Sequence, residues 1–346
     1  MGSTTADRAA AEYAKRLASM AHLPSSNTPT LSAPSANPDS QTKTNLFSTP
    51  RFRNRIPRVS NPPTKQVRYP SESDRVQRQG HLLQRADGSA LNLRGMYKGS
   101  TLFILLSGPS LKETPLHLLG RRGLVTMGVN NSWLMWKPDL WVSVDTPGRF
   151  ADVGWLDPRI LKMCPQAHAP TSTIRTMVEG SLVGTGTRVA DCPNVSFFAR
   201  EDDFNPSTFW SSPYAQWGCL KGKKDVLGMP GGRSVMLVAL KMAYWLGFKK
   251  VFLVGADFKM SMDQNVSPYA WDENKDNNGR KNNNKLYDSL NSRFGILVAQ
   301  GMPLEVYNCT KDSGLTAFPY VPFEEAVEGC TQACEKEVQT KGWYVK

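Results

Sequence analysis

Two aspartates stand where they could do chemistry. Asp145 ends the run PDLWVSVD, and Asp257 ends KKVFLVGAD, so each carboxylate follows a stretch of apolar residues. Such a carboxylate can bind Mg²⁺ beside a di- or triphosphate, or take a proton from a reacting hydroxyl. Either residue could instead orient a sugar or base hydroxyl, or simply cap a loop. The sequence leaves these alternatives open.

A turn of small residues could bind phosphate. The apolar run LFILL leads into Ser107-Gly108-Pro109-Ser110. Gly108 permits a tight turn or a close approach to a ligand, Pro109 could begin a helix, and Ser107 or Ser110 could cap it. The N–H groups at a helix start would then face an anion. An ordinary capped turn is the alternative, and the pattern is neither a Walker loop nor a GxGxxG fingerprint.

A second glycine-rich stretch, VLGMPGGRSVM, offers another phosphate site. Gly231 and Gly232 precede Arg233 and Ser234, which stand at the start of the strongest helical pattern in the chain. Flexible glycines, a guanidinium and a helix N-terminus together suit a phosphate. A flexible loop with a serine cap is the alternative.

A polar, asparagine-rich stretch at 259–285 is too long for a simple connection. Long loops at the carboxyl edge of a sheet are often lids over a site, and here Tyr269 and Trp271 could stack on a base or sugar. Thr310 and Ser313, which follow the last apolar run, are further candidate ligand or lid residues. An excursion without a role is the alternative.

The elements that would position these residues are short apolar runs closed by turn residues. Such runs occur at 101–107, 124–129, 140–145, 195–199, 251–256 and 304–308, with helical patterns at 234–246 and 285–300. Buried strands alternating with helices predict an α/β fold with a mostly parallel sheet covered on both faces. Ligands bind beyond the carboxyl ends of such strands. The polar candidates fall at those ends, including Asn130 and Asn131 after the second run.

The positive charge of the chain is concentrated at its N-terminus. The net charge is +12, and residues 1–100 hold 15 Lys and Arg against 6 Asp and Glu. We expect a disordered basic arm over 1–97 with a short helix at 6–21, a folded domain over 98–330 and a tail over 331–346. The arginine-rich segment 51–68 could contact nucleic acid or an acidic protein surface, or be a solvated linker.

Cysteine and hydropathy patterns favour a reducing, cytoplasmic location. The six cysteines show no zinc-like spacing with the four histidines, so we expect free thiols and no zinc site. The N-terminus resembles no signal peptide, and no apolar stretch is long enough to span a bilayer. No Ser-His-Asp order is evident, which weakens the case for a nucleophilic hydrolase.

Three stretches carry a resemblance to a known family. They are SGPSL at 107–111, NNSWLMWKPDLWVSVD at 130–145 and GGRSVMLVALKMAYWLGFKKVFLVGADF at 231–258. In this order they resemble the MptE-like superfamily, which joins 6-hydroxymethylpterin pyrophosphokinases, motility accessory factors that glycosylate flagellin and, more distantly, sialyltransferases of glycosyltransferase family forty-two. The resemblance covers about residues 100–327. Similar domains occur in bacteriophages, which would place a phage-encoded chain in the host cytoplasm.

The resemblance implies a Rossmann-like fold that binds a nucleotide-linked donor at the carboxyl edge. It implies that Ser107 and Asn130 contact the donor nucleotide, although the family has asparagine where Ser107 stands. The sialyltransferases use a histidine after the GADF-like strand as their base, and this chain has no histidine after His168. The PDLWVSVD stretch is closer to the other two branches, where the aspartate acts with metal.

Three hypotheses follow. The first is a transferase, most simply a glycosyltransferase with a nucleotide-sugar donor, in which the two turns hold phosphate and Asn130 reads the nucleotide. The second is an ATP- and Mg²⁺-dependent pyrophosphokinase, in which Asp145 and Asp257 are metal ligands. The third is a binding or structural module that keeps the fold without the chemistry, for which the missing histidine is the best support.

Overall fold

The computed structural model describes residues 81–333, apart from 180, 221, 230, 262, 264–266 and 272–281. The predicted helix at 6–21, the basic segment 51–68 and the end of the predicted tail therefore lie outside the described residues. The predicted boundary at 97/98 falls inside the described fold. Strand β1 (Leu83–Gln84) pairs with the main sheet, and the ring of Tyr97 stacks on Phe248 with centroids 4.6 Å apart.

A central sheet of eight strands organises the described residues. Its spatial order is β1-β8-β5-β4-β3-β2-β11-β12, and every neighbouring pair is parallel except the edge pair of β1 and β8. The strands after β1 are β2 (Thr101–Leu105), β3 (Val125–Val129), β4 (Leu140–Val142), β5 (Leu161–Pro165), β8 (Val195–Phe198), β11 (Lys250–Val254) and β12 (Glu305–Asn308). The predicted mostly parallel α/β fold is confirmed.

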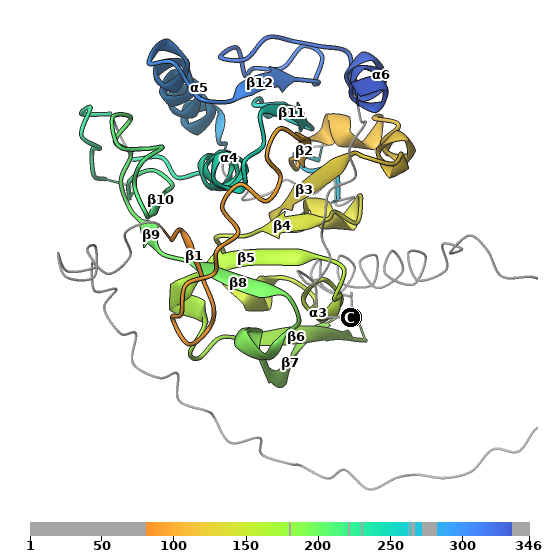
Figure 1. The fold of residues 1–346 in the computed structure, drawn as a ribbon, viewed down its shortest axis with the longest axis vertical. Coiled ribbons are helices and arrows are strands. Elements are labelled where there is room, and N and C mark those ends of the chain that lie inside the picture. Colours follow the sequence, from red (N-terminus) through yellow and green to blue (C-terminus); the bar gives the residue numbers. More distant parts are fainter. Residues whose placement is uncertain are drawn as a thin grey trace, which may run out of the picture.

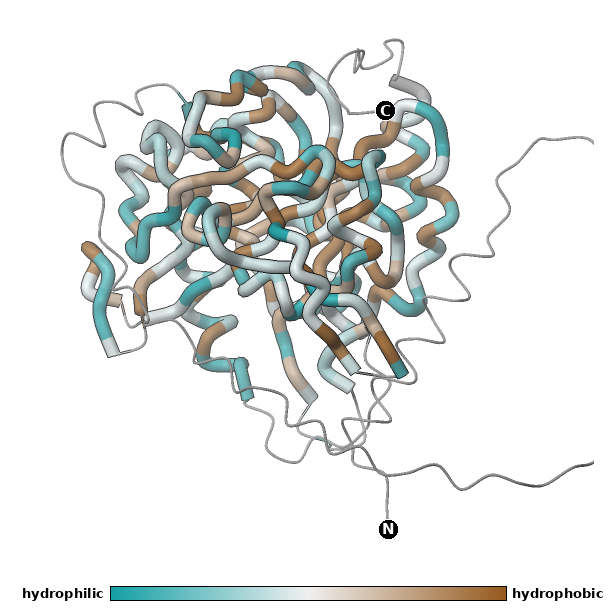
Figure 2. Tube along the Cα trace, turned by 90° about the horizontal axis from the view of Figure 1, so that it is seen from below, coloured by the Kyte–Doolittle hydropathy of each residue, from teal (hydrophilic) through white to brown (hydrophobic). Residues whose placement is uncertain are grey.

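Alternate residues of strands β2 and β4 enter different hydrophobic clusters. In β2, Leu102 and Ile104 belong to the largest cluster, whereas Phe103 and Leu105 belong to another on the opposite face. Such two-faced burial is why the sequence shows continuous apolar runs instead of alternation. Figure 2 shows the resulting concentration of hydrophobic residues inside the molecule.

Helices cover both faces of the sheet, as predicted. Helices α4 (Val235–Leu246) and α5 (Asn284–Ala299) lie on one side in Figure 1, and α6 (Phe323–Ala333) and α3 (Asp152–Leu156) lie on the other. Helix α4 begins after Ser234, whose Oγ accepts the Met236 N–H at 3.1 Å. It ends at Gly247 with φ +93°, a left-handed conformation that glycine adopts without strain.

One central strand, β5, was not expected from the sequence. Its sequence LKMCP contains Lys162, which interrupts the apolar pattern, yet Lys162 is fully buried. Its Nζ donates to the carbonyls of Asp157, Ile160 and Pro193, at 2.5, 3.1 and 2.8 Å. A buried amine is tolerated here because backbone carbonyls receive its hydrogen bonds.

Two small sheets accompany the main one. Strands β6 (Thr173–Val178) and β7 (Ser181–Arg188) form an antiparallel pair, while β9 (Arg200–Glu201) and β10 (Ala215–Gln216) form a short parallel pair. In the described part of the chain, no helix is long and apolar enough to cross a membrane.

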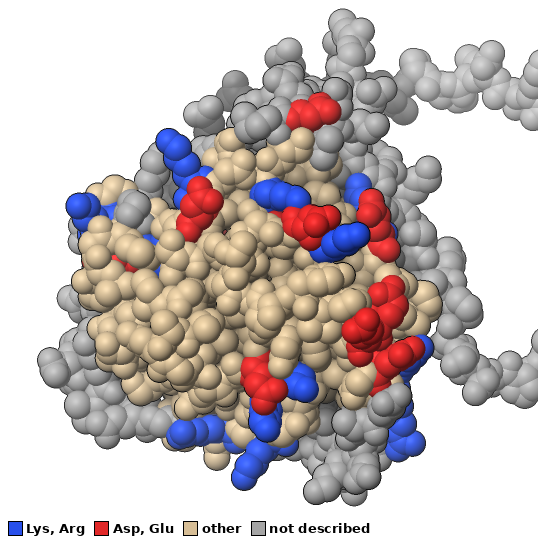
Figure 3. Space-filling view, turned by 90° about the horizontal axis from the view of Figure 1, so that it is seen from above, with Lys and Arg blue, Asp and Glu red and all other residues tan. Residues whose placement is uncertain are grey.

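Surface charges of both signs are mixed. Figure 3 views the molecule from the end where α5, β12 and α6 lie, and shows basic and acidic side chains interspersed around a broad uncharged area. This mixture fits the near balance after residue 100, where 27 basic residues meet 24 acidic ones.

Candidate functional site

A pocket of about 150 Å³ lies beyond the carboxyl ends of β2, β3 and β11. Strands β2 and β11 are neighbours in the sheet, but the chain leaves them toward opposite faces. After β2, Leu111 and Leu119 pack in one cluster, whereas after β11 helix α5 buries Leu290 and Phe294 in the other. Such a divergence opens a crevice at the strand ends, where ligands of open α/β sheets bind.

Asn130 lines this pocket with an unsatisfied side chain. Its backbone has φ +48°, and its carbonyl oxygen accepts the Trp141 Nε1–H at 2.8 Å. Its side-chain Oδ1 is buried and has no hydrogen-bond partner among the described residues. A buried polar atom without a partner costs free energy, and a ligand in the pocket would supply the missing donor. The structure therefore places Asn130 in the pocket lining, and nucleotide binding by Asn130 stays a prediction.

Tyr269 forms an aromatic wall of the pocket. Its ring stacks on Trp271 with centroids 5.2 Å apart and an interplanar angle of 12°. Trp271 also packs against the cluster around Trp141, so it supports Tyr269 and does not line the pocket itself. The segment is attached to the first turn, because Ala270 N donates to Ser107 O at 3.0 Å. The neighbouring residues 272–281 of the predicted lid lie outside the described part of the chain.

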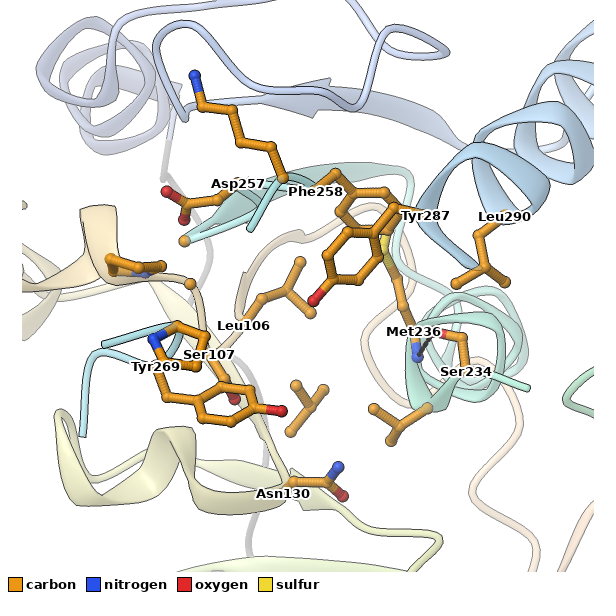
Figure 4. Close-up of a pocket in the computed structure, with 17 residues that line it drawn as sticks. Leu106, Ser107, Asn130, Ser234, Met236, Asp257, Phe258, Tyr269, Tyr287 and Leu290 are labelled. Carbon is orange, nitrogen blue, oxygen red and sulfur yellow. Dashed lines mark hydrogen bonds between the residues drawn. The ribbon is translucent and has the colours of Figure 1, made fainter. Parts of the chain in front are cut away.

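Tyr287 and Leu290 of α5 also line the pocket, and sequence analysis missed both. Figure 4 shows the hydroxyl ends of Tyr269 and Tyr287 pointing toward the middle of the pocket. Burial raises the pKa of Tyr287 to about 12, and Tyr269 acts in the same direction. Its phenol therefore stays protonated at neutral pH and can donate a hydrogen bond. The only signal in the sequence was the helical spacing of Tyr287, Leu290 and Phe294.

The first small-residue turn is fixed by Asp257. The Asp257 carboxylate accepts hydrogen bonds from Ser110 N at 3.3 Å and Ser110 Oγ at 2.7 Å. A Cβ on Gly108 would lie 1.8 Å from Asp257 Oδ2 and 2.6 Å from Gly255 O, so glycine is required there by the protein itself. In Figure 4 the carboxylate points away from the two tyrosine hydroxyls. Burial raises the pKa of Asp257, and the hydrogen bonds from Ser110 act in the opposite direction.

This arrangement limits what the turn can offer to phosphate. The predicted helix is a four-residue 3₁₀ helix, Pro109–Lys112, that follows Gly108 and has no side-chain cap, so the expected capping by Ser107 or Ser110 is wrong. Gly108 N donates to Gly255 O at 3.0 Å, and Ser110 N donates to Asp257. Phosphate binding by this turn stays a prediction, with two of its N–H donors already used.

Helix α4 offers a second candidate anion site, although Met236 N already donates to Ser234 Oγ and Ser234 N to Trp217 O. Ser234, Val235 and Met236, at its N-terminus, line the pocket directly. The first turn of an α-helix has N–H groups without carbonyl partners and carries about half a positive charge. Of the predicted glycines before it, Gly232 packs under α5, where a Cβ would lie 2.8 Å from Leu286 Cδ1, and Gly231 is outside the pocket lining.

Three further predicted site residues do not line the pocket: Arg233, Asp145 and Asn131. The guanidinium of Arg233 lies over the ring of Trp217, 4.4 Å from the centroid. Asp145 lies three residues beyond the end of β4 and outside the pocket lining, with Oδ2 3.3 Å from Arg149 Nη1. Asn131, next to Asn130, is also outside the lining.

Thr310 and Ser313 support the loop after β11. Thr310 Oγ1 accepts the Ala256 N–H at 2.8 Å, and Ser313 Oγ donates to the carbonyl of Ala256. Neither residue lines the pocket. Their hydroxyls hold the loop that carries Asp257, so the structure shows them in a positioning role.

A two-aspartate metal site is not assembled in this pocket. Asp257 lines it and Asp145 does not, and the oxygens of Asp257 already accept two hydrogen bonds. Among the described residues, no group of three His, Cys, Asp or Glu side chains could hold a metal ion. Mg²⁺ binding stays a prediction, to which this pocket contributes one carboxylate.

Comparison with known proteins gives fold-level similarities. No protein-family model matches the sequence, and no curated protein matches it. The MAf glycosyltransferase from Magnetospirillum magneticum AMB-1 is similar at 12% identity over 69% of this chain and 38% of that chain, with a TM-score of 0.35. The sialyltransferase CstII from Campylobacter jejuni, solved with the substrate analogue cytidine-5'-monophosphate, is similar at 15% identity over 65% of this chain and 85% of its own, also with a TM-score of 0.35. The chain thus spans less than half of the first protein, and its function has to be argued from the pocket.

Proposed function

We propose that the pocket binds a nucleotide-linked donor and that the chain is a transferase, most simply a glycosyltransferase that uses a nucleotide sugar. The observation that carries this proposal is the buried Oδ1 of Asn130, which has no partner in the described part of the chain and lines a pocket at the point where the strand connections diverge. Open α/β sheets bind nucleotides at such a crevice. The order of the GPSL, PDLWVSVD and GADF stretches leads to the same class.

The nucleoside would lie between Asn130 and Tyr269. An exocyclic amino group or a ribose hydroxyl of the ligand would donate to Asn130 Oδ1. Tyr269 offers a ring face backed by Trp271, and stacking on an aromatic ring contributes roughly 1–3 kcal/mol for a base. The Tyr287 hydroxyl would then be available to the sugar or phosphate.

The phosphates would lie at the N-terminus of α4. Ser234 and Val235 border the pocket there, and the helix end attracts negative charge. At the first turn, by contrast, a phosphate would have to approach the carboxylate of Asp257. Charge repulsion therefore favours the α4 side of the pocket for the phosphates.

Asp257 is the candidate base. Burial raises its pKa, and a carboxylate with a raised pKa accepts a proton from an acceptor hydroxyl more readily. The hydroxyl of Ser110 would orient it through the 2.7 Å hydrogen bond. Asp145 stays an alternative candidate, outside the pocket lining.

Thermal unfolding of the purified full chain against a nucleotide panel tests this proposal. The panel contains CMP, UDP, GDP, their sugar conjugates and ATP, each with and without Mg²⁺. Selective binding raises the melting temperature. A ligand at a hundred times its dissociation constant adds about 2.7 kcal/mol to the free energy of unfolding. A shift with one sugar nucleotide supports the glycosyltransferase, and a shift with ATP and Mg²⁺ alone would replace it by the pyrophosphokinase. No shift with any compound would refute nucleotide binding.

A variant pair links binding to the pocket. Asn130→Gly removes the side chain and keeps the left-handed backbone, and it should weaken nucleotide binding roughly three- to tenfold, the equivalent of one neutral hydrogen bond. Asn194→Gly is the matched control, because Asn194 has a similar φ of +52° but precedes β8 at the opposite edge of the sheet. Equal dissociation constants for both variants, measured by calorimetry, would remove Asn130 from the site.

A further inference from the structure

Two arginines share one tryptophan beside the pocket. The guanidinium carbons of Arg200 and Arg233 lie 4.2 and 4.4 Å from the ring centroid of Trp217. Trp217 is buried, with 7% of its surface exposed, and it follows β10. Two like charges on one ring repel each other, so the arrangement needs negative charge nearby.

Arg200 has hydrogen-bonding capacity to spare. It is half-buried, and among the described residues its side chain has one hydrogen bond, from Nη1 to Val144 O at 3.1 Å. A guanidinium has five N–H donors, so the rest of its fork is open. Burial lowers the pKa of Arg200, and the charge of Arg233 acts in the same direction.

The nearby acidic groups do not fully compensate these cations. Asp202 accepts the Trp217 Nε1–H at 2.5 Å and lies 4.0 Å from Arg233 Nη1, so the indole and the arginines share one carboxylate. Asp145 also acts on Arg200, but it is paired with Arg149. Asp202 and Asp145 are therefore each shared between these arginines and a further donor.

The neighbouring His168 is uncharged and does not compensate the charge of the arginines. Its Nε2 is buried without a partner among the described residues, and burial together with the charge of Arg200 lowers its pKa to about 4. It is neutral at physiological pH. An anionic ligand is the group that would complete the cluster.

We propose that Arg200 and Arg233, held on Trp217, form an anion-binding subsite that recognises a carboxylate or phosphate group of the acceptor substrate. Neither arginine lines the nucleotide pocket, but Arg233 directly precedes Ser234, which does. An acceptor whose anionic group binds the two guanidiniums would therefore lie next to the N-terminus of α4. The guanidinium fork binds both anions bidentately. The assignment to the acceptor rests on the proposed transferase function, whereas the anion site itself does not.

Nuclear magnetic resonance of the Trp217 indole tests the subsite on the full chain. The chain has nine tryptophans, so its indole N–H signals form a small set, and Trp217→Phe assigns the one that matters. Sodium phosphate and sodium acetate are titrated separately at constant ionic strength maintained with chloride. We expect a saturable shift of the Trp217 signal, and the anion that binds more tightly identifies the ligand chemistry.

Matched charge-removing variants decide the outcome. Arg200→Gln and Arg233→Gln should each weaken anion binding about tenfold, equivalent to about 1.4 kcal/mol. Arg188→Gln, at an exposed arginine paired with Asp191 on the β6–β7 hairpin, should leave it unchanged. If Arg200→Gln fails to fold, Arg233→Gln still tests the proposal, because Arg233 is exposed and its replacement should not disturb the fold. A linear shift, or an unchanged dissociation constant in Arg233→Gln, overturns the proposal.

A competition experiment separates this inference from the proposed function. The nucleotide that raises the melting temperature is added to the phosphate titration. Simultaneous binding, with the nucleotide effect preserved in Arg233→Gln, supports an acceptor subsite. Competitive displacement of phosphate would assign the arginines to the donor, which overturns the inference and leaves the proposed function standing. Anion binding without any nucleotide binding would refute the transferase and with it the acceptor role.

Discussion

Gly108 lies where the protein has no room for a side chain, so Gly108→Ala should be strongly destabilising. The added Cβ would lie 1.8 Å from Asp257 Oδ2 and 2.6 Å from Gly255 O. Moving the carboxylate aside would break its bonds to Ser110 N and Oγ, at 3.3 and 2.7 Å. Hydrogen bonds to charged groups contribute roughly 1.5–3 kcal/mol and overpacking costs roughly 1–3 kcal/mol, which gives a loss of about 2.5–6 kcal/mol.

Urea and thermal unfolding measure this loss. For a domain of this size, about 2.5–6 kcal/mol corresponds to a fall in melting temperature of roughly 5–24 °C. Gly184→Ala is the control, because a Cβ on Gly184 would meet nothing within 4 Å. The Asp257→Ala background should reduce the cost of Gly108→Ala by about 1.5 kcal/mol or more, since the carboxylate is then absent. A change below about 0.5 kcal/mol for Gly108→Ala, or an equal cost in both backgrounds, would refute the reasoning.

Three further predictions concern the core and its helices. Arg293→Met should lower the free energy of unfolding, measured in urea, by about 3–5 kcal/mol, because it leaves the fully buried carboxylate of Asp225 without its 2.7 Å ion pair. Adding Asp225→Asn to this variant should restore part of the lost stability. If it restores none, the buried charge is not the cause. Burial lowers the pKa of Lys241 from 10.5 to about 7, so between pH 7 and 8.5 the unfolded chain binds more protons than the folded one. The free energy of unfolding should therefore rise with pH over this range. Lys241→Met should flatten this slope, and an unchanged slope would show that other groups cause it. Gly295→Ala within α5 should stabilise the fold by up to about 1 kcal/mol, since a Cβ there meets nothing within 4 Å, and a lower urea midpoint would contradict this.

The sheet could be predicted where burial leaves a continuous apolar run. The runs at 101–107 and 251–256 correspond to β2 and β11, each shorter than predicted because its last residues turn into the pocket loops. Strand β5 could not be predicted, because Lys162 makes LKMCP look half-polar. Its amine is satisfied by three carbonyls, one of them from Pro193, which is 31 residues away in the sequence. Sequence patterns report the side chain but not the distant group that satisfies it.

The same limit applies to the site. The local pattern was correct, since the predicted helix at 234–246 corresponds to α4, Val235–Leu246. The partner of the first turn could not be found, because Asp257 is 147 residues from Ser110. The stacking of Arg233 on Trp217 is also a tertiary contact without a local signal. The first contact engages Ser110 with a carboxylate of the protein, and the second keeps Arg233 out of the pocket lining.

Residue type alone therefore does not separate function from structure at this edge of the sheet. Ser110, Thr310 and Ser313 follow strands, as sites in this fold require, but their hydroxyls are engaged by Asp257 and by the backbone of its loop. Asn130 and Arg200 follow strands too, and they retain an unpartnered buried oxygen and an open guanidinium fork. The engaged hydroxyls stabilise the fold by themselves. The unengaged oxygen and guanidinium are unfavourable without a partner, and a bound ligand would supply that partner. The unsatisfied groups, one acceptor after β3 and one cation after β8, lie at the carboxyl edge of the same sheet, and they are thus the strongest reason to expect a donor and an anionic acceptor at that edge.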